Sequence, residues 1–159
     1  MPRKVTKKLQ RELKPDRKYQ SVLVQRLINK SMLDGKKLTA ERAVYSALEQ
    51  AAKKLDSEDP LEVFERALKN VSPNFEVKSR RVGGANYQIP FPVAGHRQLH
   101  YAFSWLVQSA RGRSGIPYAQ RLSLEIVDAY NGAGAAFKKK EDTHKMAEAN
   151  RAFAHFARS

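Results

Sequence analysis

Apolar residues recur at intervals of three and four along six segments, a spacing that predicts amphipathic helices. The first segment starts at Tyr19, carries Val24, Leu27, Ile28 and Met32 on one face, and stops at the helix-ending pair Asp34-Gly35. The other five helices are expected at about 38–55, 60–71, 99–110, 118–130 and 135–156. Asp59 is placed to cap the third helix, with Pro60 at its first position. The last helix has a weak apolar face at 138–145, so its first part is expected to project from the core.

Residues 74–92 follow a different period. Phe75 to Lys78 and Tyr87 to Ile89 alternate apolar and polar side chains, and Gly83-Gly84 lies between the two runs as a turn. This pattern predicts a two-stranded β-ribbon between the third and fourth helices of a mainly α protein. Because an isolated hairpin is marginally stable in water, the ribbon must pack on the helices or be held by a partner.

The length of 159 residues suits one domain with one core. Residues 1–18 are densely basic and poor in apolar groups, which predicts a flexible arm that orders on its partner. A merely solvated tail is the alternative. Residues 19–159 then form a single helical domain with the ribbon.

The net charge of the chain indicates which class of molecule it binds. Thirty Lys and Arg stand against sixteen Asp and Glu, a formal net charge of +14. A compact body with that excess repels itself unless a polyanion neutralises it, so nucleic acid is the first candidate and an anionic membrane surface the second. The absence of cysteine excludes disulfides and thiol chemistry and fits a reducing cytosol. The sequence shows neither a secretory signal at its start nor an apolar run long enough to cross a membrane.

Several separate basic blocks are candidate RNA contacts, an arrangement that favours a broad surface wrapped by folded RNA over a single recognition helix. Lys78, Arg80 and Arg81 lie on the ribbon, where Arg80 and Arg81 point to opposite faces, so that one packs back while the other reaches a phosphate. Arg111 and Arg113 lie in a glycine-bearing loop, and the run 138–140 covers most of a helical turn. For each block a solvated surface is the alternative.

Enzyme chemistry finds little support in the sequence. His96 and His100 could share a helix face, but no carboxylate lies nearby in the sequence to complete a metal or catalytic site. We therefore expect no catalytic residues, no metal and no cofactor. An RNA-modifying or RNA-cleaving enzyme using His96 or His100 is the alternative, and a peripheral membrane protein is a third reading that the scarcity of large apolar groups in the arm disfavours.

Longer strings of residues resemble a known family, small-subunit ribosomal protein seven of the bacterial type. The matching strings lie in order along nearly the whole chain, at 28–30, 32–37, 64–71, 80–90, 105–107, 139–142 and 146–155. The chain departs from the usual pattern at Ser104 and His96, where arginine is commoner, and in its non-aromatic C-terminus.

The resemblance implies six helices with a protruding ribbon, a cytoplasmic location in the small ribosomal subunit, and no enzymatic activity. It implies primary binding to the 3′ major domain of the small-subunit ribosomal RNA, nucleation of head assembly, and a seat near the exit-site tRNA and the mRNA path. Small-subunit ribosomal proteins nine and eleven are implied neighbours. The expected rRNA-binding residues are Arg3, Lys4, Lys7, Lys8, Arg11, Lys18, Lys36, Lys37, Lys78, Arg80, Arg81, Arg97, Arg111, Arg113, Lys138, Lys139, Lys140, Lys145 and Arg151. The expected tRNA-facing residues are Gly83, Gly84, Ala85, Asn86 and Tyr87.

Overall fold

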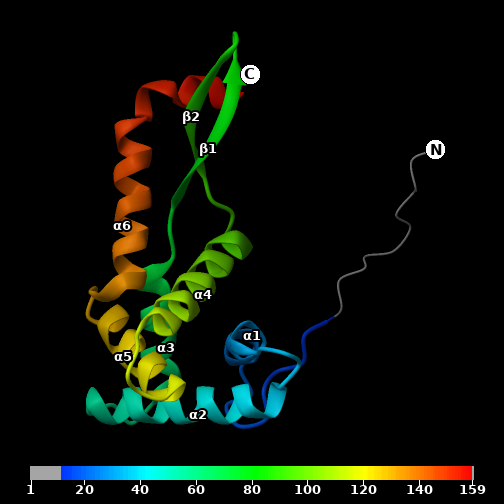
Figure 1. Cartoon of the computed structure of the whole chain (residues 1–159), viewed down its shortest axis with the longest axis vertical. Helices are drawn as coiled ribbons and strands as arrows, with labels where there is room; N and C mark the ends of the chain where they lie inside the picture. Colours follow the sequence, from blue (N-terminus) through cyan, green and yellow to red (C-terminus); the bar gives the residue numbers. More distant parts are fainter. Residues whose placement is uncertain (1–11, 159) are drawn as a thin grey trace, which may run out of the picture.

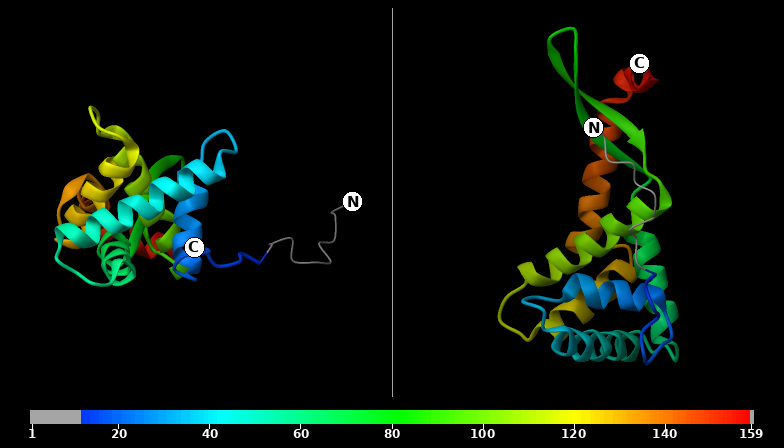
Figure 2. Two further views of the ribbon diagram at one scale, coloured as in Figure 1. Left: turned by 90° about the horizontal axis from the view of Figure 1, so that it is seen from below. Right: turned by 90° about the vertical axis from the view of Figure 1, so that its right-hand side faces the viewer.

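Six α-helices and one β-ribbon make up the fold of residues 12–158, as the sequence pattern predicts. The structure, a computed structural model, describes residues 12–158. Its elements are α1 (Val22–Ser31), α2 (Lys37–Lys54), α3 (Pro60–Val71), β1 (Phe75–Val82), β2 (Ala85–Pro92), α4 (Gly95–Gly112), α5 (Tyr118–Tyr130), α6 (Gly134–Ala149) and the 3₁₀ helix η1 (Arg151–Arg158). The ribbon and α6 rise together from one end of the helical body (Figure 1), and the second view agrees (Figure 2).

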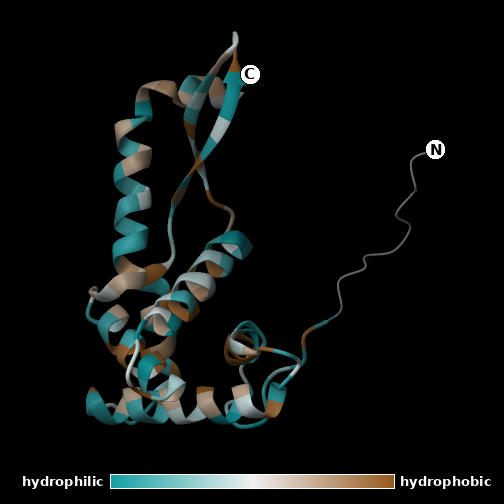
Figure 3. Cartoon of the chain, viewed as in Figure 1, coloured by the Kyte–Doolittle hydropathy of each residue, from teal (hydrophilic) through white to brown (hydrophobic). Residues whose placement is uncertain are grey.

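Helix α5 lies at the centre of the body. It packs against α2, α3, α4 and α6, and its side chains Leu122, Ile126 and Ala129 are fully buried. The apolar stripes of the other helices meet around it, which is why brown residues in Figure 3 gather where helices face one another. The core thus uses the residues that the periodicity selects, including Val44, Leu48, Phe64 and Leu106.

Helix α3 starts as the sequence indicates. The Asp59 carboxylate accepts a hydrogen bond from the Leu61 N–H at 2.8 Å, and Pro60 occupies the first helical position.

Several predicted helix boundaries were wrong, and two of them have clear physical causes. The first helix does not begin at Tyr19, because Gln20 adopts a left-handed backbone (φ +52°) and Ser21 caps the helix instead. The last helix does not run to about Phe156: α6 ends at Ala149, and η1 then turns across toward the ribbon (Figure 1). Long-range packing against the ribbon, which local periodicity does not report, sets this second boundary.

Only Ala136 and Ala147 are buried in α6. The helix therefore projects beside the ribbon with most of its polar surface in solvent, as its weak apolar face predicts (Figure 3).

Candidate nucleic-acid interface

The ribbon is a regular antiparallel pair closed by a two-residue turn. Val82 pairs with Ala85, and the intervening Gly83 and Gly84 have φ of +57° and +90°. Two successive left-handed residues match the right-handed twist of a hairpin, and glycine adopts them without steric cost. The tip therefore carries no side chain at these two positions and can approach another backbone closely.

A buried carboxylate clamps the base of the ribbon to α4. Glu76, only 5% exposed, accepts hydrogen bonds from Arg97 Nε at 2.8 Å, Tyr101 Oη at 2.5 Å and Lys78 Nζ at 2.9 Å. Burial alone would raise the pKa of Glu76, but these three donors outweigh it and lower the pKa to about 2. Tyr101 in turn stacks on Trp105, with ring centroids 5.3 Å apart. Lys78 and Arg97, both predicted RNA contacts, thus also orient the ribbon.

The two arginines of the ribbon stem have different surroundings. Arg80 Nη1 donates to the backbone oxygen of Phe156 at 3.1 Å. Its cross-strand partner Tyr87 packs on Phe153 and Phe156, with centroids 5.1 and 5.5 Å apart. Arg81 points to the other face and makes no hydrogen bond or ion pair with any residue in 12–158. The expectation that one arginine packs back and leaves the other available matches this arrangement.

A groove of about 400 Å³ runs between α1 and α4. Its polar rim combines two cations, an amide and two histidines over an apolar floor; the lining residues are Arg26, Asn29, Lys30, His96, Leu99, His100 and Phe103. Such a mixture suits phosphates and base edges. The sequence prediction did not include Arg26, Asn29 and Lys30 among its candidate contacts. In the sequence these residues are marked only by lying opposite the apolar stripe of α1. The groove itself forms because α4 packs beside that face.

The lysines of α6 divide into two groups. Lys140 Nζ donates to the Asn70 oxygen at 2.6 Å, and burial lowers the Lys140 pKa. Lys139 Nζ donates to Gln108 Oε1 at 3.2 Å. Lys138 and Lys145 are both without such a contact inside the described part of the chain. The second pair is therefore the one that this helix offers to an anionic partner.

Arg113 holds the α4–α5 connection and the start of α6 together. Its guanidinium donates to Glu125 Oε2 at 2.8 and 3.0 Å and also pairs with Asp128. The fully buried Glu125 accepts a further hydrogen bond from the Ala136 N–H at 2.8 Å. The positive charge of Arg113 is thus largely neutralised within the protein, and its contact with RNA stays a prediction.

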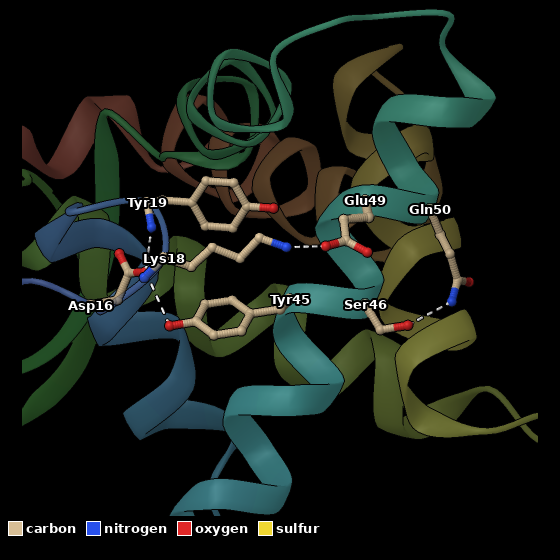
Figure 4. Close-up of polar contacts among 7 residues, drawn as sticks. All are labelled: Asp16, Lys18, Tyr19, Tyr45, Ser46, Glu49 and Gln50. Carbon is tan, nitrogen blue, oxygen red and sulfur yellow. Dashed lines mark hydrogen bonds and ion pairs between the residues drawn. The ribbon is translucent and has the colours of Figure 1, made fainter.

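The start of the described chain is fastened to α2 (Figure 4). Asp16 accepts hydrogen bonds from the backbone N–H groups of Lys18, Tyr19 and Ser21 at 2.8–2.9 Å. Burial would raise the pKa of Asp16, but these donors and the Tyr45 hydroxyl lower it.

Lys18 lies between the rings of Tyr19 and Tyr45 and pairs with Glu49, so its charge has a partner within the fold. The other predicted contacts of the arm, Arg3, Lys4, Lys7, Lys8 and Arg11, lie outside the described residues.

Among the predicted RNA contacts that lie in residues 12–158, unpaired cations are found at three places. Of the predicted contacts, Lys36 and Lys37 at the α1–α2 turn, Arg81 on the ribbon, and Lys138 and Lys145 on α6 form no ion pair or side-chain hydrogen bond with residues 12–158. Arg111, by contrast, donates to the Ser31 oxygen at 3.3 Å, and Arg151 pairs with Glu148. A surface with free cations on the body, the ribbon and α6 is suited to phosphates spread over folded RNA.

Other classes of site find no support in the described residues. From 12 to 158 no group of three His, Asp or Glu side chains is arranged to hold a metal ion. Within the same range, each helix is too short or too polar to cross a membrane.

Comparison with known proteins decides the family. The family model described as ribosomal protein S7p/S5e matches residues 2–151. The chain belongs to this family. A relative from Thermomicrobium roseum, the small ribosomal subunit protein uS7, is 56% identical over 156 residues, which cover 98% of this chain and 99% of the relative. The uS7 protein of Chloroflexus aggregans is 55% identical over 148 residues, covering 93% and 94%. That of Hydrogenobaculum sp. is 54% identical over 160 residues, covering 98% and 99%.

Membership in the S7p/S5e family confirms several predictions. The chain is a ribosomal protein of the small subunit, it works in translation as a structural, non-enzymatic component, and it associates with ribosomal RNA. Its place is the small subunit in the bacterial cytoplasm. The enzyme reading based on His96 and His100 is thereby excluded.

Proposed function

We propose that the protein is a primary binder of the 3′ major domain of the small-subunit ribosomal RNA and nucleates assembly of the subunit head. The observation that carries the proposal is the set of cations that the fold leaves unpaired at the α1–α2 turn, on the ribbon and on α6. Arg97 and Arg113, which pair with the carboxylates of Glu76 and Glu125, hold the elements that carry these cations in position. The surface is therefore preorganised, and RNA supplies the missing counter-charge.

The basic arm, residues 1–18, extends this surface in the proposal. Its last residues are fastened on α2 through Asp16 and Lys18. RNA that contacts the α1–α2 turn, which follows the other end of α1, can then be contacted at a second point. Protection of the arm from protease in the RNA complex, compared with the free protein, tests this part.

The ribbon tip has a separate proposed role at the subunit interface. Gly83 to Asn86 carry no charge, and Figure 1 shows that the tip protrudes beyond the helices. The tip and Tyr87 are proposed to face the exit-site tRNA and the mRNA path, with small-subunit ribosomal proteins nine and eleven as neighbours. Shortening the tip while keeping the turn should leave binding to the isolated RNA domain unchanged and alter tRNA retention or frame maintenance in assembled subunits. Loss of RNA binding on shortening would contradict this role.

Two lysine pairs at opposite ends of α2 test the proposed RNA surface. Replacing Lys36 and Lys37 with alanine should weaken binding to the isolated 3′ major domain by about 10-fold or more and reduce the salt slope by about two. The change should not harm the fold, because cations at a helix N-terminus oppose the helix dipole. Replacing Lys53 and Lys54, an exposed pair at the other end of α2, is the matched control and should change binding by less than about 2-fold. Equal weakening by both pairs would show unspecific attraction and overturn the proposal.

A further inference from the structure

A second groove, of about 380 Å³, lies between the α1–α2 turn and the connection from α4 to α5. The residues that matter in its lining are Leu33, Lys36, Ala43, Arg111, Tyr118 and Arg121. The volume falls in the range of small-ligand pockets and is too small for a helix or a duplex. An occupant must therefore be a single group inserted from outside.

Hydrogen bonds within the protein hold the walls of this groove. The Tyr118 hydroxyl donates to Ser31 Oγ at 2.8 Å, and Arg111 Nη2 donates to the Ser31 backbone oxygen at 3.3 Å. Arg121 Nη1 donates to the Arg113 backbone oxygen at 2.6 Å. These bonds connect the end of α1 with the distant segment from the end of α4 to the start of α5, so the groove exists before any ligand arrives.

The turn that forms one wall is held in an unusual conformation with apolar side chains in solvent. Asp34 has a left-handed backbone (φ +51°), which costs energy for a residue other than glycine. Leu33 is 59% exposed, and Leu38, the second residue of the following helix, is 64% exposed. Large apolar groups displayed next to a preformed groove are typical of a binding site.

Charge identifies the kind of occupant. Lys36, Arg111 and Arg121 line the groove against a single carboxylate, that of Asp34, so the site favours an anion. Tyr118 and the apolar side chains Leu33 and Ala43 offer surfaces for a flat ring. A nucleotide has both parts, a base that stacks on aromatic or guanidinium groups and a phosphate that pairs with cations.

We propose that this groove takes one unstacked nucleotide of the ribosomal RNA, with the base against Leu33, Ala43 and Tyr118 and a flanking phosphate on Lys36 and Arg111. The inference rests on the proposed RNA-binding function and adds to it a contact with a base in a loop or bulge. Specific recognition of RNA generally uses such splayed-out bases. The site therefore gives the protein a way to recognise a loop rather than only the charge of the backbone.

Filling the groove without changing charge tests the site. Ala43 is half-buried on α2, and Ala43→Leu adds bulk to the lining with a residue that favours helices. Gln50→Leu, at a half-buried position of α2 outside the groove, is the matched control. Binding to the isolated 3′ major domain should weaken about tenfold for Ala43→Leu, the effect of losing one stacked base, and stay unchanged for the control. The salt slope should equal that of the original protein, because no cation is removed.

Base-specific chemical probing supplies the second readout. One base should be protected by the original protein and reactive again with Ala43→Leu. Leu33→Ser, at a position already in solvent, should have the same effect and keeps the test decisive if Ala43→Leu lowers the melting temperature.

The outcomes separate the two proposals. Failure of the original protein to bind the RNA domain would overturn the proposed function. If the original protein binds normally and both variants keep its affinity and base protection, only the nucleotide site is overturned. Occupation of the groove by an acidic segment of another protein would overturn that site as well.

Discussion

Glu76 shows how one buried carboxylate sets the direction of a whole element. It is the common acceptor for Lys78, Arg97 and Tyr101, and the three donors come from β1 and α4. Both cations are about half-exposed, so they keep part of their hydration while the carboxylate gives up nearly all of its own. The ion pairs and hydrogen bonds must therefore compensate for that loss, and the ribbon base is fixed as a consequence.

Glu76→Gln should destabilise the protein by about 2–3 kcal/mol at pH 7, because the ionised carboxylate has a pKa lowered to about 2 in the folded state. A lowered pKa contributes stability that is present above the unfolded value of about 4.5 and is lost as pH falls toward 2. The difference between the two proteins should thus shrink over that window. Denaturant unfolding at pH 7, 4 and 2.5 measures it. Glu65→Gln, at an exposed position on α3, is the control, and a pH-independent difference would contradict the argument.

Element boundaries depend on single residues where two helices meet. Gly134 begins α6 with φ +88°, and a Cβ there would lie 2.8 Å from Asp128 Cβ and 3.2 Å from Glu125 Oε1. Both side chains also hold Arg113, so neither can move without breaking that network. The direction of α6, and with it the position of Lys138 and Lys145, follows from this close approach.

Gly134→Ala should cost about 1–3 kcal/mol through backbone strain and the clash with Asp128. Gly112→Ala is the matched control, because Gly112 ends α4 without a left-handed φ and with open space around it. Its effect should stay within about 0.5 kcal/mol. Thermal unfolding of both variants makes the comparison, and equal effects would show that the start of α6 can shift freely.

Arg80 and Arg81 should separate structure from binding within the ribbon. Arg80→Ala removes the bond to Phe156 and should speed amide hydrogen exchange in 75–92 and 151–158, while the core helices stay protected. Arg81→Ala should leave exchange unchanged and weaken RNA binding by about 1–2 kcal/mol, if that side chain contacts a phosphate. Exchange that responds to Arg81→Ala but not to Arg80→Ala would reverse the assignment.

The sequence predicts elements better than it predicts their mutual contacts. The stripes through Leu48, Phe64 and Leu106 select core residues correctly, since burial follows helical periodicity. The neutralisation of Arg113 by Glu125 is invisible in the sequence, where the two stand 12 residues apart and nothing marks the carboxylate as buried. The groove that adds Arg26 and Lys30 likewise arises from the packing of α1 on α4.

At the scale of the whole molecule, only some of the thirty Lys and Arg side chains are available to a partner, although pairing within the fold leaves the net charge of +14 unchanged. The fold uses Lys18, Lys78, Arg97 and Arg113 in internal ion pairs. The remaining cations are spread over the body, the ribbon and α6, so binding must neutralise phosphates at several separate places. The affinity should then depend on salt more steeply than a single basic patch would allow.

RNA affinity should fall about a thousandfold between 50 and 200 mM monovalent salt if roughly six phosphates are neutralised. Filter binding to the 3′ major domain across this range gives the slope directly. Competition with an unrelated RNA duplex of equal length is the control for unspecific attraction. A nearly flat dependence would contradict an interface dominated by phosphate contacts.

The contact of η1 with the ribbon has a consequence for the order in which the molecule is completed. Arg80 and Phe156 are 76 residues apart in the chain. During synthesis the strands emerge long before the residues that brace them, and contacts of such long sequence separation form late in folding. Until η1 has been made, the nascent ribbon is therefore held by Glu76 at its base and by its contacts with α6, without the contact at Arg80. A chain interrupted between α6 and η1 would display the helical body with a ribbon that lacks this contact, so the contact reports that η1 has been made.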